Sequence, residues 1–283
     1  MLLEVLEEDL LQDVRTALSE DIGSGDITAA LVPDEETVMA TVISRDTAVL
    51  CGMAWFNAVF AELDTGIQVD WQARDGETIS PDQVLCTLAG NAAPILTGER
   101  TALNFLQTLS GTATLARQYA DAVSGLPVRI LDTRKTIPGL RQAQKYAVRT
   151  GGCHNHRMGL FDAILIKENH IAAAGSIAAA VAAARTSSPG SPVELEVENP
   201  GQLAAALAAG ADSLLLDNFT TAELSDAVTQ VAGRIPLEAS GGVSLVNVRD
   251  IALTGVDSIS VGELTKNVHA VDFSMLFRNL ARP

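Results

Sequence analysis

The residues of this chain that could do chemistry gather in a basic stretch of an otherwise acidic protein. The 283-residue chain has a formal net charge of −16. Between Arg129 and Lys167, however, eight lysines and arginines stand against two acids, Asp132 and Asp162. A local excess of positive charge can draw an anion into a cleft while the rest of the surface stays acidic. We therefore expect a small ligand that carries several negative charges.

Three cations of this stretch stand at positions that suggest a role. Arg134 and Lys135 follow a predicted strand and precede a tight turn, so they are either solvated loop charges or ligands of an anion. Lys167 closes the apolar run 163–166, where burying an ammonium is costly unless its charge is paired. It could contact a substrate anion, act as a Schiff-base nucleophile, or form an ion pair with Glu168 or an acid of a neighbouring strand.

Cys153, His154 and His156 stand close enough together to suggest a metal site. No second cluster has the spacing that would complete a tetrahedral zinc shell, so we do not predict one. His156 lies beside Arg157 and is better suited to donate hydrogen bonds to an anion, whereas His154 is expected to be a loop side chain.

Carboxylates at two predicted strand ends supply the opposite charge. Glu194, Glu196 and Glu198 alternate along one strand, so we expect all three on the same side. Asp217 ends the next apolar run. A pair of carboxylates suits Mg²⁺, which keeps several waters and bridges phosphate oxygens. We expect Glu196 and Asp217 to hold this ion, and ion pairing with nearby cations is an alternative that does not exclude it.

Glycine-bearing loops follow the last two predicted strands. Ser240, Gly241 and Gly242 follow one strand and are expected to open a helix, and Gly262 takes the equivalent place after Val261. Glycines let backbone N–H groups approach an anion, and a helix N-terminus favours negative charge. The loops after the last two strands of a β/α barrel commonly hold a phosphate. The two loops therefore predict a phosphate site, with plain turn glycines as the alternative.

The elements that position these residues follow from an alternation of apolar and helical segments after residue 127. Short apolar runs predict six strands, at 128–131, 163–166, 193–197, 213–216, 236–239 and 258–261. Segments of helical composition lie between them, at 140–149, 177–185, 202–209, 222–231 and 245–253. Repeated βα units give parallel strands with right-handed crossovers.

Polar groups at almost every strand end decide between two parallel folds. In a β/α barrel all these ends converge on one mouth, whereas an open sheet binds ligands only near its switch point. No GxGxxG follows a strand, which also counts against a dinucleotide fold. We therefore predict an α/β architecture, a C-terminal β/α barrel that is incomplete, with six or seven strands.

The first part of the chain predicts a small antiparallel α+β sandwich. Its strands are expected at 38–44, 48–51, 67–71 and 84–88, and its helices at 3–18 and 54–63. Residues 95–123 predict a long helix or a helix pair. We place the N-terminal domain at 1–110, which residues 266–283 could complete, and the barrel at 111–283.

Composition excludes several classes of protein. The apolar fraction of 47% is too high for disorder, and the acidic balance argues against a nucleic-acid partner. Three scattered cysteines give no disulfide framework. The N-terminus lacks the basic region of a signal peptide, and no run reaches the ~20 apolar residues of a membrane span. We expect a cytoplasmic protein with no membrane partner.

The strings that carry these residues resemble the type II phosphoribosyltransferases, most closely the quinolinate phosphoribosyltransferase family. The resemblance runs over nearly the whole chain and is densest between Asp132 and His170. The similar strings are 99–101, 132–141, 145–148, 151–152, 155–157, 166–170, 194–198, 216–219, 240–242 and 261–262.

The resemblance implies a pentosyltransferase reaction. The ring nitrogen of quinolinate attacks C1 of 5-phosphoribosyl 1-diphosphate, diphosphate leaves, and CO₂ is lost to give nicotinate mononucleotide for NAD synthesis. The resemblance assigns quinolinate to a set of cations, in which arginine offers bidentate geometry for a carboxylate. These are Arg134, His156, Arg157 and Lys167, with Arg100 contributed by a partner subunit.

The resemblance assigns binding of the phosphates to a second set of residues, which comprises Thr133, Lys135, Ser240, Gly241, Gly242, Val261 and Gly262. Glu196 and Asp217 would hold Mg²⁺ or the ribose hydroxyls and would face the positive charge that develops at C1. The resemblance also implies a homodimer, with a higher assembly left open, in which the small domain of one subunit covers the barrel mouth of the other.

Three other functions stay open from the sequence. A class I aldolase-type barrel would use Lys167 as its Schiff-base former. A phosphoribosyltransferase of the same fold would act on nicotinate without decarboxylation. A non-catalytic phosphosugar-binding regulator would show no turnover, although Glu196 and Asp217 argue against it.

Overall fold

The computed structural model describes residues 7–33 and 36–279, and the chain folds into two compact units. The first unit comprises Met1–Arg117, Ile137–Gly152 and Asn267–Pro283, and the second comprises Gln118–Thr136 and Cys153–Lys266. The chain therefore passes between the units four times. The expected division between residues 110 and 111, with residues 266–283 open as a part of the first domain, stays a prediction.

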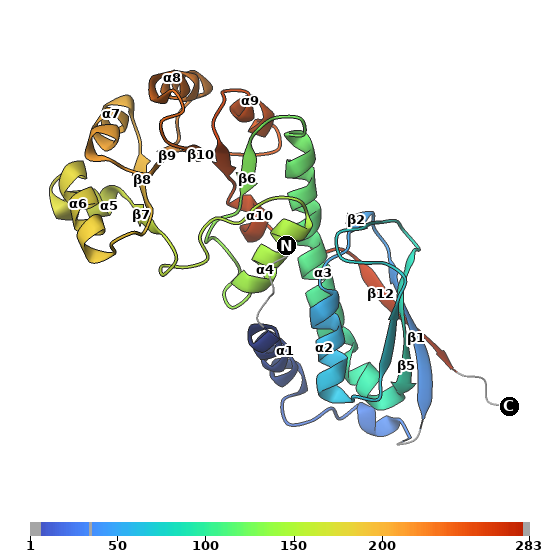
Figure 1. Ribbon diagram of the computed structural model, residues 1–283. Helices are drawn as coiled ribbons and strands as arrows, with labels where there is room; N and C mark the ends of the chain where they lie inside the picture. The colour runs from blue at the N-terminus through green and yellow to red at the C-terminus, as the bar shows by residue number, and fades with distance from the viewer. Residues whose placement is uncertain (1–6, 34–35, 280–283) are drawn as a thin grey trace. The chain divides into compact units, whose positions relative to one another are not determined.

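The first unit is built on an antiparallel sheet in the strand order β12-β1-β5-β3 (Figure 1). Its strands are β12 (Phe273–Asn279), β1 (Thr37–Ser44), β5 (Val84–Asn91) and β3 (Gln68–Trp71). A separate ribbon pairs β2 (Ala48–Val49) with β4 (Thr78–Ile79). The four strands predicted for this part of the chain are confirmed, and the sequence patterns do not predict β4 or β12.

The first unit also contains helices. They are α1 (Glu7–Ile22), η1 (Ala29–Leu31), α2 (Met53–Leu63), α4 (Arg141–Thr150) and most of α3 (Ala92–Ala122). Trp55, Phe56 and Phe60 of α2 are buried. Phe56 packs edge-on against Trp71 of β3, with ring centroids 5.2 Å apart, and so joins the helix to the sheet. Residues 3–6 of the predicted first helix lie outside the described residues.

The segment predicted as a long helix or a helix pair is one helix, α3, of 31 residues. Its internal glycine Gly111 does not break it but allows a close approach. A Cβ at this position would lie 2.0 Å from the carbonyl oxygen of His269, so the chain leading into β12 passes directly against the helix. Within the described ranges, neither α3 nor any other helix is long and apolar enough to cross a membrane.

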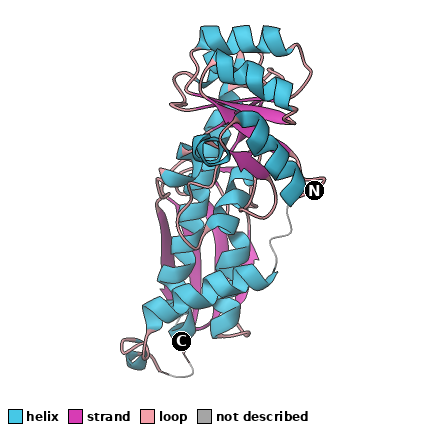
Figure 2. Cartoon of the chain, turned by 90° about the vertical axis from the view of Figure 1, so that its left-hand side faces the viewer, coloured by secondary structure: helices cyan, strands magenta, loops and turns pink. Residues whose placement is uncertain are grey.

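The second unit is a parallel sheet in the order β6-β11-β10-β9-β8-β7. Its strands are β6 (Arg129–Leu131), β7 (Ile164–Ile166), β8 (Val193–Val197), β9 (Ser213–Asp217), β10 (Leu237–Ser240) and β11 (Ser258–Ser260). Its helices are α5 (Glu168–Ala174), α6 (Ile177–Ser187), α7 (Pro200–Ala209), α8 (Thr221–Val231), α9 (Val248–Ala252) and α10 (Glu263–Lys266). The strands form an arc with α6 to α9 outside it (Figure 1), and the turned view of Figure 2 again shows helices above the strands.

All six predicted parallel strands are confirmed, and the sheet is an incomplete barrel. Among residues 7–33 and 36–279 no strand pairing joins β7 back to β6. The alternation along β8 explains how a strand can serve both core and site: Val193, Leu195 and Val197 are buried, whereas Glu194 and Glu196 are partly accessible on the other side. Parallel strands of this kind bury one face against helices and leave the other for the barrel interior.

Two local expectations are wrong. Gly242 does not open a helix, because the chain first makes a turn that the side chain of Asn247 closes, and α9 begins only at Val248. Glu198 is not part of the strand that holds the other two glutamates, since β8 ends at Val197 and Glu198 is exposed beyond it.

Candidate active site

The carboxyl ends of the six parallel strands lie along one edge of the sheet, which we call the strand-end rim. Strand register places Ser240 beside Asp217, and the Val261 N–H donates to the Leu131 carbonyl at 2.9 Å. The rim consists of Thr133, Arg134 and Lys135 after β6, Gly262 after β11, Ser240 to Gly242 at β10, Asp217 at β9, Glu196 on β8 and Lys167 after β7. Predicted residues from distant parts of the sequence thus follow neighbouring strands.

Lys135 lies over Gly262, where the ends of β6 and β11 meet. A Cβ on this glycine would come 3.1 Å from Lys135 Cδ and 3.8 Å from Thr133 Oγ1. The loop is held by two hydrogen bonds, one from the Lys135 N–H to Thr133 Oγ1 at 3.0 Å and one from Thr265 Oγ1 to the Lys135 carbonyl at 2.7 Å. The glycine therefore leaves room for the exposed lysine at the rim.

A second close approach joins the ends of β9 and β10. Gly241 has a φ of 92°, and a Cβ there would lie 2.2 Å from Asn218 Oδ1. The Asn218 N–H donates to the Ser240 carbonyl at 2.9 Å, and its side chain donates to Asp217 Oδ2 at 2.7 Å. The loop therefore needs glycine for its backbone conformation and for space, which gives it a structural reason besides the predicted phosphate site.

Lys167 and Glu196 form an ion pair through Nζ and Oε2. This is the pairing with an acid of a neighbouring strand that the sequence left open. The lysine side chain is 43% exposed and the glutamate side chain 10% exposed, so the pair stands at the surface of the barrel interior. A bound anion could pair with Lys167, and a bound cation could pair with Glu196, in place of this ion pair.

Arg134 and Arg157 are two guanidinium groups close enough to affect each other. Burial, and after it the charge of Arg134, lowers the pKa of Arg157 from its usual value. Arg157 Nη1 donates to the Ala163 carbonyl at 3.1 Å. The buried Nε of Arg134 has no hydrogen-bond partner among the described residues. A bound anion would satisfy this donor and offset the repulsion between the cations.

His156 lies on the loop between α4 and β7, and its ring contacts two carboxylates. Its Nε2 is 3.2 Å from Glu194 Oε2 and 3.5 Å from Glu238 Oε2. Its Nδ1 accepts the Arg157 N–H at 2.7 Å, and its own N–H donates to Oδ1 of the buried Asp132 at 2.9 Å. In this arrangement protein groups occupy both ring nitrogens, and the role of His156 toward quinolinate stays a prediction.

Glu238 is a residue that the sequence reasoning did not place in the site. It is buried on β10, and burial, followed by the nearby charge of Glu194, raises its pKa to about 7. The available signal was an acid inside the apolar run 236–239, since a buried carboxylate is rare unless it is paired. Its partner His156 could not be read from the sequence, because 82 positions separate them.

The carboxylates predicted to hold Mg²⁺ lie on adjacent strands. Glu196 is on β8, and Asp217 ends β9. The register pairs Val197, which follows Glu196, with Leu216, which precedes Asp217. Two carboxylates at neighbouring strand ends are of the ligand type that Mg²⁺ prefers. The ion pair to Lys167 would have to give way for Glu196 to serve as a ligand.

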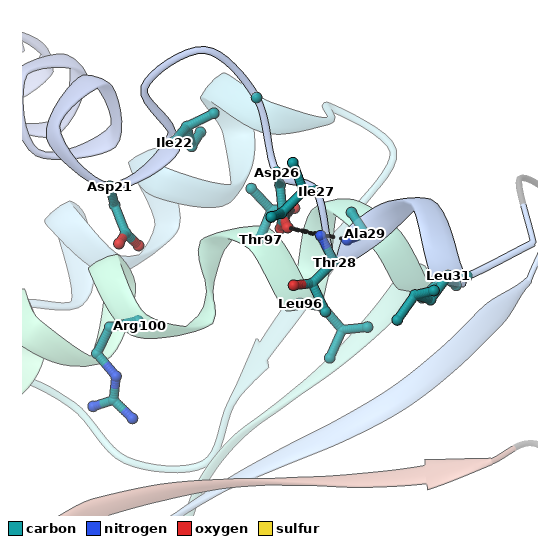
Figure 3. A pocket seen from close by; sticks show the side chains of 12 residues that line it. Asp21, Ile22, Asp26, Ile27, Thr28, Ala29, Leu31, Leu96, Thr97 and Arg100 are labelled. Carbon is teal, nitrogen blue, oxygen red and sulfur yellow. Dashed lines mark hydrogen bonds between the residues drawn. The ribbon is translucent and has the colours of Figure 1, made fainter.

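Arg100 belongs to the first unit and is an exposed residue of α3. With Asp21 and the loop that follows α1 it lines a pocket of about 500 Å³ (Figure 3). Asp26 shapes this loop by accepting the N–H groups of Thr28 and Ala29 at 2.9 and 3.0 Å. The role predicted for Arg100 at a partner subunit's site stays a prediction.

The fold and the rim define the class of this protein as an incomplete β/α barrel with cations and carboxylates at its mouth. Residues 26–110 match the model of the N-terminal domain of quinolinate phosphoribosyl transferase, and residues 112–276 match the model of its C-terminal domain. The chain belongs to the quinolinate phosphoribosyltransferase family.

Individual relatives agree with this assignment. The chain is 43% identical to the nicotinate-nucleotide pyrophosphorylase (carboxylating) of Mycobacterium leprae, over 95% of this chain and 98% of the relative. It is 40% identical to the probable nicotinate-nucleotide pyrophosphorylase (carboxylating) of Bacillus subtilis, over 90% and 89%. The solved nicotinate-nucleotide pyrophosphorylase of Francisella tularensis superposes with a TM-score of 0.94, at 45% identity, over 98% of this chain and 99% of that one.

Proposed function

We propose that this protein transfers the phosphoribosyl group of 5-phosphoribosyl 1-diphosphate to quinolinate and forms nicotinate mononucleotide, diphosphate and CO₂, a step of NAD synthesis. The observation that carries the proposal is the strand-end rim, which combines a cation-rich part with paired carboxylates on adjacent strands. The reaction also agrees with the names of relatives, among them a quinolinate phosphoribosyltransferase (decarboxylating) of Nicotiana tabacum.

The two carboxylates of quinolinate call for cations with directed donors. Arg134 offers a buried Nε without a partner among the described residues, and Arg157 lies near enough for its pKa to respond to Arg134. A guanidinium can hold a carboxylate through two parallel hydrogen bonds. Lys167 adds a third cation once its ion pair with Glu196 opens. Together the three cations would bind the ring and orient its nitrogen toward the sugar.

Transfer requires stabilisation of positive charge at C1 as diphosphate leaves. Glu196 and Asp217 stand at neighbouring strand ends and supply negative charge that is already in place before the reaction. Lys135, which lies above Gly262, would contact the departing phosphate groups. Mg²⁺, when bound, would neutralise part of the charge of the phosphates.

Loss of CO₂ follows from the product of the transfer itself. Once the ring nitrogen carries the sugar, the ring is cationic, and the electron pair left by the departing 2-carboxylate is stabilised next to that nitrogen. The electron pair at C2 then takes up a proton from water, so the protein has to hold the ring and admit a proton donor, and the same cations that bind quinolinate can hold the ring in this step.

The direct test is incubation of the protein with quinolinate, 5-phosphoribosyl 1-diphosphate and Mg²⁺, with nicotinate mononucleotide and CO₂ measured together. Equal amounts of both are expected. Transfer to nicotinate with no CO₂ from quinolinate would instead identify a phosphoribosyltransferase without decarboxylation. No turnover of either pyridine would contradict the proposal.

Removal of Mg²⁺ is expected to abolish product formation. EDTA in excess should reduce the rate to background, and readdition of Mg²⁺ should restore it, because the diphosphate charge would otherwise remain unneutralised. Quinolinate binding alone, followed by calorimetry, should persist in EDTA, since the cations and not the metal bind it. Full activity in EDTA would contradict the metal requirement.

We also propose a cytoplasmic homodimer in which Arg100 enters the site of the partner subunit. Arg100→Ala and Lys167→Ala should each lose most activity. Mixed dimers of the two variants should regain part of it, because one of their two sites would then contain both residues. Failure of any mixture to exceed the separate variants would contradict a shared site.

A further inference from the structure

Glu238 is a carboxylate at a position where the fold alone gives no reason for one. It is 3% exposed and pairs in register with Leu215 of β9 and Ser258 of β11. A carboxylate buried without compensation costs several kcal/mol, so its partner should matter. The structure places His156 beside it, with 3.5 Å between Glu238 Oε2 and His156 Nε2.

Glu194 reaches the same ring nitrogen from the other side of β9. Its Oε2 is 3.2 Å from His156 Nε2, and the side chains of Glu194 and His156 are 16% and 14% exposed. Two carboxylates from non-adjacent strands therefore converge on one N–H. This favours the imidazole tautomer that carries its proton on Nε2.

The tautomer has a consequence at the other ring nitrogen. With the proton on Nε2, Nδ1 is an acceptor, and it accepts the N–H of Arg157 at 2.7 Å. A proton on Nδ1 would face that N–H and break the hydrogen bond. Glu194 and Glu238 contact one nitrogen of the imidazole ring, and through the tautomer they control whether the other nitrogen accepts the hydrogen bond of the Arg157 backbone N–H.

Fixing the backbone of Arg157 matters because its guanidinium is one of the cations proposed to bind the substrate. Its guanidinium is partly buried near Arg134, and its Nη1 is bonded to the Ala163 carbonyl. Two crowded guanidinium groups bind a dicarboxylate well only if both are fixed, since a displacement of about 1 Å can cost on the order of 100-fold in rate.

We propose that Glu238, together with Glu194, is a positioning residue that acts through His156 to fix Arg157 at the mouth of the barrel. The identity of the dicarboxylate rests on the proposed function, whereas the chain of contacts does not. Glu238 itself is too deeply buried to touch the substrate.

The substrate-free test is ¹⁵N NMR of the full-length protein labelled at histidine, in which only four histidines contribute signals. His156, identified by the signal lost in His156→Asn, is expected to be protonated on Nε2 and to show a hydrogen-bonded acceptor at Nδ1. Glu238→Leu should shift the ring toward the other tautomer or an exchanging mixture, and Glu238→Gln, which keeps an acceptor oxygen, should shift it less. A proton on Nδ1 in the unmodified protein would overturn the proposal.

The kinetic test separates positioning from general destabilisation. Glu238→Leu is expected to raise KM for quinolinate on the order of 10-fold, with KM for 5-phosphoribosyl 1-diphosphate changed less than about twofold and with Glu238→Gln restoring most of the loss. In the His156→Asn background the same change should have little further effect, because the two residues act in series. Equal rises in both KM values, or additive effects, would overturn the proposal.

Glu223→Ala provides the control for stability. Glu223 caps α8 through hydrogen bonds from the Thr220 N–H and Oγ1 at 2.8 and 2.7 Å, so its loss should lower Tm without changing KM or the His156 signal.

If Glu238→Leu does not fold, Glu194→Ala removes the less buried carboxylate and carries the same expectation.

A divalent cation is the rival explanation, because the candidate ligand atoms of His156, Glu194 and Glu238 lie within 4.8 Å of one another. EDTA should leave the His156 signal unchanged, and a change on chelation would overturn the proposal. If the NMR result holds but no pyridine is turned over, the proposed function fails and the positioning contacts stand.

Discussion

Glu196→Gln is expected to lower kcat by at least about 100-fold and, at the same time, to tighten quinolinate binding to the substrate-free protein. The first effect follows because a carboxylate aimed at developing positive charge is lost. The second follows because Glu196 is the ion-pair partner of Lys167, so the substitution releases this cation for the substrate. An ion pair with a partly exposed member contributes about 1 kcal/mol or less, so the gain in affinity should not exceed about fivefold.

Calorimetry of quinolinate binding and single-turnover kinetics measure the two effects separately. Asp226→Asn is the matched control, since it removes one negative charge at an exposed position of α8 in the same unit. It should change neither value. Weaker quinolinate binding in Glu196→Gln would show that the lysine is not available to the substrate, and unchanged kcat would remove Glu196 from the reaction.

Arg157→Ala is expected to lower kcat/KM for quinolinate by at least about 30-fold. Truncation of one partner of a desolvated charge pair costs about 2–5 kcal/mol, and each 1.4 kcal/mol is roughly a factor of ten. Arg157→Lys keeps the charge but loses the planar fork and the hydrogen bond from Nη1 to Ala163, so it should recover only part of the loss.

Steady-state kinetics with quinolinate varied at saturating 5-phosphoribosyl 1-diphosphate test this expectation. Arg185→Gln is the control, because it removes a guanidinium whose ion pair to Asp212, at 2.8 Å, lies on the surface of the same unit. This variant should keep its kinetic constants. A value of kcat/KM within about threefold of the unmodified protein for Arg157→Ala would exclude the residue from the anion site.

Much of the second unit could be predicted because its sequence signals are local. An apolar run of four or five residues that ends in Lys167 or Asp217 marks both a strand and a site position, and the parallel arrangement brings such ends to one edge. The resemblance then supplied roles that spacing could not. The ion pair of Lys167 with Glu196 was one of several open possibilities for this lysine. It depends on the register of β7 and β8, which pairs Ile166 with Leu195 and so brings the next residues, Lys167 and Glu196, side by side.

Other features depend on contacts that no local pattern encodes. The strand β12 has no partner near it in the sequence and pairs with β1. The convergence of Glu194 and Glu238 on His156 requires three separate segments and the order of the strands between them. Gly242 was expected to open a helix, whereas the chain first makes a turn closed by the side chain of Asn247.

The pairing of β1 with β12 also affects the order in which the two units can fold during synthesis. Ser44 pairs with Phe273 and Val38 with Asn279, so β1 meets a strand that follows all the segments of the second unit. Until β12 has been synthesised, one edge of β1 lacks its partner, and unpaired strand edges are prone to association. The segments of the second unit all precede β12 and can fold during translation. The sheet that contains β1 is therefore completed only after the strands of the second unit have been made.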